Sequence, residues 1–156
     1  MDNTNRAPRR FGGVLMTDRR GPDEAVMLLR LAPAQDERFS FEFYGCLIIA
    51  VLHMFKGPAG LLFDIASTPV ISDAAGKPLA LLTNGQLSDS MRSALERIRS
   101  HLRSRSAAEP RAGVPPAIVD QLRFYVFDKG DAHVGPDWRI GYAGKTYPLD
   151  QTERAA

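Results

Sequence analysis

The sequence predicts an α+β fold, in which a mainly antiparallel sheet of about six or seven strands packs against two main helices. Short apolar segments separated by Gly, Pro, Asn and Asp are typical of antiparallel strands joined by turns. Residues 88–105 carry apolar side chains at helical spacing, and residues 44–56 form a continuous apolar run with the length of a buried helix. These observations together place two helices against one sheet.

Length and composition indicate a single domain. The chain has 156 residues, of which 44% are hydrophobic and 24% charged, as in soluble globular proteins. Residues 1–10 are expected to be a flexible basic tail and residues 11–150 one α+β domain with a linker near 104–116. Residues 151–156 are expected to be a frayed C-terminus.

Three observations favour a soluble, cytoplasmic protein that does not associate with a membrane. Cys46 is the only cysteine, which excludes an intramolecular disulfide and a cysteine-based zinc site. The longest apolar run is about half as long as a membrane-spanning helix. The first residues have no apolar segment of the kind that a secretory signal requires.

The N-terminal part of the domain is expected to supply three strands. Residues 11–17 form a short apolar segment. Residues 23–31 fit either a helix, because a proline and two acids precede the apolar part, or a buried strand; their short length between two proline-containing turns favours the strand. Residues 38–44 alternate three phenylalanines with polar residues, which predicts a half-buried strand with an aromatic inner face.

The middle of the chain is expected to contain a helix, a central strand and a hairpin. Residues 44–56 are assigned to a buried helix because of their length and because the Gly- and Pro-containing segment 57–60 ends it. Residues 61–65 are then a short central strand. Residues 70–83 are predicted to form a hairpin with its turn at 73–77.

Residues 88–105 contain the clearest helical pattern. Ser88 or Asp89 can cap its N-terminus, and arginines crowd its C-terminal half, as the helix dipole favours. The apolar residues at positions i, i+4, i+7 and i+11, which should face the core, are Met91, Leu95, Ile98 and Leu102.

The C-terminal part is expected to form a short helix and an antiparallel meander. Residues 116–122 suit a short helix that begins at a proline. Residues 123–128, 138–142 and 145–149 read as three strands, and the Ala-Gly pair at 143–144 supplies the tight turn between the last two.

Asp64 and Asp73 are the aspartates that most suggest chemistry. Asp64 ends an apolar segment, and its surroundings resemble the nucleophile motif of haloacid-dehalogenase-type phosphatases, with Thr68 in a matching place. The second aspartate that this motif requires is Ala66 here, so the family is excluded. Asp64 is therefore interpreted as the end of a core strand.

Cys46 and His53 are interpreted as structural residues. On a helix they would share one face about 10 Å apart, which is too far for a thiol–imidazole pair. The apolar neighbours of Cys46 should raise the pKa of its thiol, and His53 should satisfy a buried polar bond.

A polar loop over residues 128–137 is the best place for a metal or catalytic site if the protein is an enzyme. Carboxylates at this spacing can hold a hard cation, although the loop lacks the glutamate of an EF-hand, and a plain connection between strands would have the same composition. We expect the plain connection, with no cofactor. The candidate ligands are Asp128, Asp131, His133 and Asp137.

A basic helix is the strongest functional signal. Residues 1–20 contain five arginines against two aspartates, and residues 91–111 contain six arginines against two glutamates. The helix could track the phosphates of a nucleic-acid backbone, or it could be a solvated face in which Arg92 pairs with Glu96. The predicted partner-binding residues are Arg92, Arg97, Arg99, Arg103 and Arg105.

These features favour a non-catalytic interaction or regulatory module that acts through protein–protein contacts and forms a homo-oligomer. The alternative is a nucleic-acid-associated protein that uses the arginine-rich helix 88–105 and the basic tail. A third possibility is a small hydrolase-like enzyme that uses Asp64, Asp73 or the loop 128–137. Convergence of one of these aspartates with a histidine would favour the enzyme.

Overall fold

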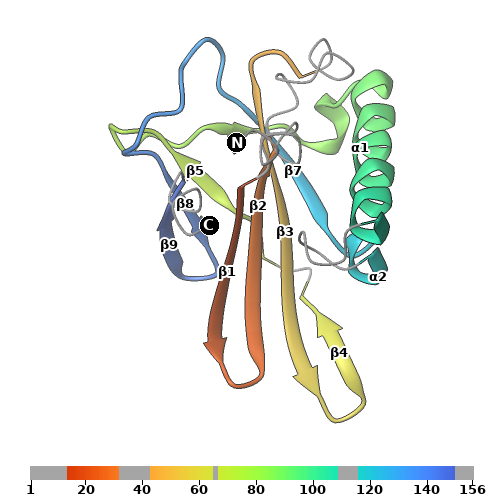
Figure 1. The fold of residues 1–156 in the computed structure, drawn as a ribbon. Helices are drawn as coiled ribbons and strands as arrows, with labels where there is room; N and C mark the ends of the chain where they lie inside the picture. The colour runs from red at the N-terminus through yellow and green to blue at the C-terminus, as the bar shows by residue number, and fades with distance from the viewer. Residues whose placement is uncertain (1–13, 32–42, 65–66, 109–115, 150–156) are drawn as a thin grey trace, which may run out of the picture.

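The computed structural model describes residues 14–31, 43–64, 67–108 and 116–149. It is an α+β fold with a mostly antiparallel six-stranded main sheet and a smaller three-stranded second sheet (Figure 1). The main sheet has the order β1-β2-β3-β7-β6, and β4 also pairs with β3. Its strands are β1 (Val14–Gly21), β2 (Glu24–Leu31), β3 (Cys46–Gly57), β4 (Gly60–Phe63), β6 (Ala80–Leu81) and β7 (Arg123–Asp128).

The second sheet has the order β5-β8-β9, and its strands are β5 (Val70–Ser72), β8 (Arg139–Tyr142) and β9 (Lys145–Pro148). The long helix α1 (Asp89–Ala108) is preceded by the 3-10 turn η3 (Asn84–Gln86) and followed by the short helix α2 (Pro116–Val119). Figure 1 shows α1 on one side of the main sheet and the second sheet on the other. The molecule therefore has three layers.

The core fills both spaces between these layers. On one face of β3, Leu47, Ile49 and Val51 pack in one cluster with residues of the second sheet such as Ile140. On the opposite face, Ile48 packs with residues of α1 such as Ile98. The main sheet is thus covered on both sides along β3.

The helix expected over residues 44–56 is wrong, because this segment is the strand β3. Residues Leu47 to His53 are all buried, since both faces of the strand are covered. A strand buried on both faces shows no alternation of apolar and polar residues, and its sequence looks like that of a buried helix. Among the described residues, α1 is the only long helix. Cys46 and His53 lie on opposite faces of β3, because side chains of a strand alternate.

The strand expected at residues 61–65 is present as β4, but it is not central. β4 pairs only with the last residues of β3, and Leu61 and Leu62 are 53% and 60% exposed. The segment is apolar without being buried.

The expected hairpin over residues 70–83 is divided between the two sheets. β5 pairs with β8 and β6 pairs with β7, so a single bridge between Ser72 and Pro78 connects the two arms. Asp73 holds the turn, since its Oδ1 accepts hydrogen bonds from the main-chain N–H of Ala75 at 3.0 Å and of Lys77 at 2.9 Å. Asp73 is a turn residue.

Other predictions are confirmed. Residues 23–31 contain a strand, β2, and the helix expected over 88–105 is α1. Ser88 caps it, since its Oγ accepts a hydrogen bond from the N–H of Met91 at 3.1 Å. Leu95 and Ile98 are buried as expected, whereas Met91 and Leu102 are partly buried.

The C-terminal strands form as predicted but do not build one meander. β7 joins the main sheet, while β8 and β9 form a hairpin in the second sheet. Ala143 and Gly144 have φ values of 48° and 84°, so both turn residues are left-handed, as a tight two-residue hairpin turn requires.

Several expectations fall outside the described residues. They concern the basic tail 1–10, the terminus 151–156 and most of the strand expected at 38–44. Of the linker expected near 104–116, residues 104–108 belong to α1 and residues 109–115 lie outside the described residues.

Candidate functional site

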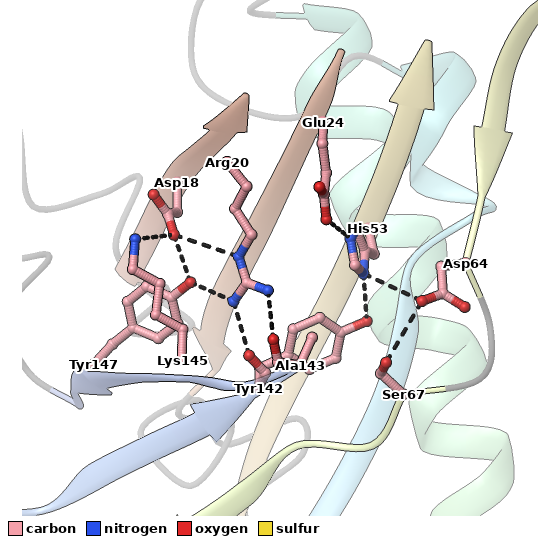
Figure 2. A network of polar contacts seen from close by, with 10 residues as sticks. All are labelled: Asp18, Arg20, Glu24, His53, Asp64, Ser67, Tyr142, Ala143, Lys145 and Tyr147. Carbon is pink, nitrogen blue, oxygen red and sulfur yellow. Dashed lines mark hydrogen bonds and ion pairs between the residues drawn. The ribbon is translucent and has the colours of Figure 1, made fainter. Parts of the chain in front are cut away.

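Polar side chains gather at one end of the space between the two sheets (Figure 2). Asp18 pairs with Val26 across β1 and β2, and Val26 pairs with His53 across β2 and β3. Residues directly opposite one another share a face of the sheet, so Asp18 and His53 both point toward the second sheet. Arg20 lies two residues after Asp18 on β1, and Glu24 lies two residues before Val26 on β2. This spacing places both side chains on the same face as Asp18 and His53.

His53 is the centre of a first group, the His53 cluster, whose members are Glu24, His53, Asp64, Ser67 and Tyr142. His53 is 4% exposed, and its Nε2 lies 2.7 Å from Glu24 Oε2. Its Nδ1 lies 3.1 Å from Tyr142 Oη and 3.4 Å from Asp64 Oδ2. Both ring nitrogens therefore face a carboxylate. The hydroxyl of Tyr142 can donate to Nδ1 or accept from it, according to the tautomer of the ring.

Asp64 directly follows β4 and is a partner of His53. Its main-chain N–H donates to the carbonyl of His53 at 2.9 Å, which continues the pairing of β4 with β3. Its Oδ2 accepts from Ser67 Oγ at 3.4 Å. The Asp64 and Glu24 side chains are 26% and 30% exposed, whereas the imidazole is 3% exposed. Solvent therefore reaches the carboxylates but hardly reaches the ring.

Tyr142 closes the His53 cluster from the second sheet. Burial raises the pKa of its phenol, and the nearby Asp64 raises it further, while a hydrogen bond with Ser67 opposes both. The phenol consequently stays protonated and uncharged at neutral pH. Its ring stands edge-on to the imidazole at a centroid distance of 5.4 Å, and Phe55 stacks on the imidazole at 4.7 Å.

A second group, the Arg20 cluster, consists of Asp18, Arg20, Lys145 and Tyr147. Arg20 donates to the carbonyls of Tyr142 at 2.7 Å and Ala143 at 2.8 Å, and to Tyr147 Oη at 2.6 Å. The two carbonyls belong to the tight turn of the β8–β9 hairpin. The guanidinium thus ties that turn to β1.

Asp18 gathers the donors of the Arg20 cluster. Its Oδ2 accepts from Tyr147 Oη at 2.6 Å and from Lys145 Nζ at 3.0 Å. These hydrogen bonds, first that of Tyr147 and then that of Lys145, lower the pKa of Asp18. Burial, followed by the hydrogen bond to Asp18, raises the pKa of Tyr147. Tyr147 is therefore the donor and Asp18 the acceptor at neutral pH.

The His53 cluster does not gather its carboxylates around one cation. Glu24 and Asp64 face opposite nitrogens of the ring, so they cannot join it around one cation. Among the residues that the structure describes, no group of three or more His, Cys, Asp or Glu side chains is placed to hold a metal ion. Both nitrogens of His53 already have partners. The cluster links the two sheets.

The predicted loop ligands do not join this cluster. Asp128, Asp131, His133 and Asp137 are all exposed. Asp128 Oδ1 accepts from the N–H of Gly130 at 3.1 Å, which is a local turn contact.

The predicted partner-binding arginines make contacts within the molecule. Arg99 donates to the carbonyls of Val119 at 2.8 Å and Leu122 at 3.0 Å, and its guanidinium lies 4.6 Å from the centre of the Phe124 ring. Arg103 forms an ion pair with Asp120. These contacts fasten α1 to α2 and to the start of β7.

The remaining arginines of α1 differ in their surroundings. Arg92 pairs with Asp89 at 2.9 Å and donates to the carbonyl of Asn84 at 2.7 Å, while Glu96 lies near Arg99. Arg97 is exposed, and the Arg105 side chain lies outside the described part of the structure. Burial raises the pKa of the Cys46 thiol, in the direction expected.

The sequence interpretation missed most of the two clusters. It found Asp64 and His53 but did not connect them, and it assigned no role to Glu24, Arg20 or Tyr142. One signal was present: Glu24 shares the period-two alternation of β2 with Val26, so an acid occupies an inward position of the strand.

Within the described residues, no helix is long and apolar enough to cross a membrane. Comparison of the chain with protein-family models, with curated proteins and with solved structures finds no match.

Proposed function

We propose that this protein is a cytoplasmic, non-catalytic interaction module and that the β3–β4 hairpin is its contact surface, with a second copy of the chain as the partner. The observation that carries the proposal is the exposure of Leu61 and Leu62, at 53% and 60%. Two adjacent leucines on one strand bring apolar surface to both faces of the hairpin, because neighbouring side chains alternate.

The edge of β4 is open to pairing. β4 pairs with β3 on one side, and no other strand of the described residues pairs with it. Figure 1 shows the hairpin extending away from α1 and the second sheet. An uncharged apolar edge strand favours strand addition, since nothing in its sequence repels a second strand.

A second copy suits this edge because the pairing would be symmetric. Two β4 strands that pair antiparallel are related by a two-fold axis, and such an interface closes at the dimer. Gly60–Phe63 contains no charged residue, so two copies do not bring like charges together. The cytoplasmic part of the proposal is supported by the single cysteine, because a chain that cannot form an internal disulfide suits a reducing compartment.

The internal contacts of the polar groups support the non-catalytic part of the proposal. Both nitrogens of His53 are occupied, and Arg99 and Arg103 are engaged within the molecule. A binding role through Arg99 or Arg103, including a nucleic-acid role, would require these contacts to be given up.

The experiment is a comparison of Leu62→Lys with the wild-type protein by sedimentation velocity over a series of concentrations. The wild type should dimerise and the variant should stay monomeric, because a lysine on an edge strand opposes pairing. Val70→Lys is the matched control, since Val70 is 49% exposed on the edge strand β5 and should leave the dimer intact. A wild type that is monomeric throughout, or a Leu62→Lys variant that still dimerises, would contradict the proposal.

A second candidate, the small hydrolase-like enzyme, is favoured by one observation, the 3.4 Å approach of Asp64 to His53. Screening ester and phosphate-ester substrates with the wild type and Asp64→Asn would test it. Hydrolysis that Asp64→Asn abolishes without loss of thermal stability would favour the enzyme over the interaction module.

A further inference from the structure

The main sheet leaves an open position beside the first half of β7. β6 pairs only with the end of β7, Ala80 with Asp128 and Leu81 with Phe127. The N–H of Leu82 donates to the carbonyl of Val126 at 2.9 Å, and the chain then turns into η3. A strand that continued β6 would therefore lie beside Tyr125, Phe124 and Arg123, where the described chain has none.

The main-chain groups of Phe124 face this open position. In an antiparallel pair of strands, residue pairs that exchange hydrogen bonds alternate with pairs that do not. The carbonyl of Val126 points to β6, so Val126 and its partner Ile48 on β3 form a pair without hydrogen bonds between them. The same holds two residues earlier for Phe124 and Ala50, so the N–H and C=O of Phe124 also point away from β3. Neither group has a partner among the described residues.

A groove runs along the same edge. Its volume is about 370 Å³, and Arg99, Asp120, Arg123, Phe124 and Tyr125 are among its lining residues. Figure 1 shows β7 starting beside α2.

The groove carries an excess of positive charge. Asp120 is paired with Arg103, and Arg99 Nε lies 3.7 Å from Glu96 Oε1 while its Nη1 donates to two main-chain carbonyls, so the excess charge comes from Arg123. Arg123 is exposed and has no polar partner in the described part of the chain. A free guanidinium thus stands next to an unpaired stretch of strand.

We propose that this groove binds an extended acidic peptide segment of a partner protein, which adds a strand to the β7 edge. One residue of the peptide would exchange two main-chain hydrogen bonds with Phe124, as in other cases of strand addition. An Asp or Glu side chain of the peptide would pair with Arg123, whose fork of donors fits a carboxylate. This site uses different residues from the proposed β4 contact and goes beyond it.

The main-chain N–H and C=O of Phe124, one donor and one acceptor side by side, distinguish a peptide from a phosphate ligand. A phosphate group could occupy Arg123, but it has no N–H to offer the Phe124 carbonyl. A peptide backbone supplies both an N–H and a C=O at one residue. The chemistry of the edge therefore fits a peptide.

The test uses fluorescence anisotropy with a labelled peptide amide, Thr-Val-Thr-Glu-Thr-Val, and the same peptide with Lys in place of Glu. The glutamate peptide should bind saturably, and the lysine peptide should bind about tenfold more weakly, as loss of one charge-assisted hydrogen bond predicts. Arg123→Glu should weaken the glutamate peptide by at least about tenfold. Arg19→Glu is the matched control, because Arg19 is an exposed strand arginine on β1, and it should change binding less than about twofold.

Main-chain pairing is tested with two further peptides, N-methylated at alternate residues. Only one of them should lose binding, because alternate N–H groups of a strand point to opposite sides. Absence of saturable binding, equal binding of both methylated peptides, or an unchanged affinity in Arg123→Glu would overturn the proposal. Displacement of the peptide by a mixed-sequence single-stranded oligonucleotide, together with equal binding of both methylated peptides, would identify a phosphate site instead.

The same titration with Leu62→Lys separates the two proposals. If the peptide still binds to this variant, the groove proposal is supported whether or not the wild type dimerises through β4. Loss of peptide binding in Leu62→Lys, with the fold intact by circular dichroism, would show that the groove depends on the hairpin and would overturn an independent site.

Discussion

The two faces of the main sheet are held to their neighbours by different forces. The face toward α1 is joined by apolar packing, with Ile48 and Ile98 fully buried, and its arginines act at the margin of that contact. The face toward the second sheet is apolar at one end and polar at the other, where the His53 and Arg20 clusters lie (Figure 2). The same sheet therefore has one contact that depends on burial and one that depends also on directional bonds.

The reason for the difference lies in what each layer needs. A helix satisfies its own main-chain groups, so α1 can be held by one apolar stripe. The second sheet is three short strands, and the carbonyls of its tight turn at Tyr142 and Ala143 need donors, which Arg20 supplies. Directional hydrogen bonds to these turn carbonyls fix the orientation of the second sheet relative to the main sheet, which apolar packing alone does not do.

The largest expected effect is on the helix side. Ile48→Ala removes a fully buried side chain and should lower the free energy of unfolding by about 2–5 kcal/mol, because a cavity remains. Urea denaturation followed by circular dichroism measures this. A loss below about 1 kcal/mol would show that the contact between α1 and the sheet is loosely packed.

His53→Leu tests the polar end of the other face and should cost about 1–3 kcal/mol. The substitution leaves the carboxylates of Glu24 and Asp64 without their shared partner, although their partial exposure limits the penalty. The double variant Glu24→Gln/His53→Leu should recover part of the loss. If His53→Leu were as stable as the wild type in the same urea measurement, the His53 cluster would not hold the sheets together.

Arg99→Gln should lower the free energy of unfolding by about 1–2 kcal/mol, since it removes two hydrogen bonds to carbonyls and a cation–π contact. Arg92→Gln is the control and should change stability by no more than about 0.5 kcal/mol, because Arg92 is exposed near the start of α1. Thermal unfolding measures both variants. If both lower the unfolding temperature equally, the Arg99 contacts do not contribute more to stability than those of an exposed arginine. The sequence assigned Arg99 to partner binding, whereas these contacts lie within the molecule.

The smallest expected effect is a pH dependence from Asp18. Its pKa is lowered in the folded protein, so its contribution to stability is present above its unfolded value of about 3.9 and is lost as the pH falls through the folded value. Asp18→Asn should therefore be less stable than the wild type at pH 7, and the difference should shrink below about pH 4. Thermal unfolding of both proteins between pH 3 and 7 would reveal it, and a difference independent of pH would contradict it.

Local pattern predicted much of the fold. The strands β2 and β7, the helix α1 with its Ser88 cap, and the turn at Ala143 and Gly144 were all expected from period, capping and turn chemistry. These features depend on neighbours within a few residues, so the sequence carries their full signal. The antiparallel α+β class followed from them.

Tertiary structure alone decided the rest. Whether residues 44–56 form a helix or a strand depends on what covers them, and both faces of β3 are covered by segments distant in the chain. The His53 cluster likewise joins Glu24 of β2, Asp64 just after β4 and Tyr142 of β8, and no local spacing in the sequence indicates these contacts. Hydrophobic periodicity reports which side of a segment is buried, but it cannot report burial on both sides or the partners that long-range pairing brings together.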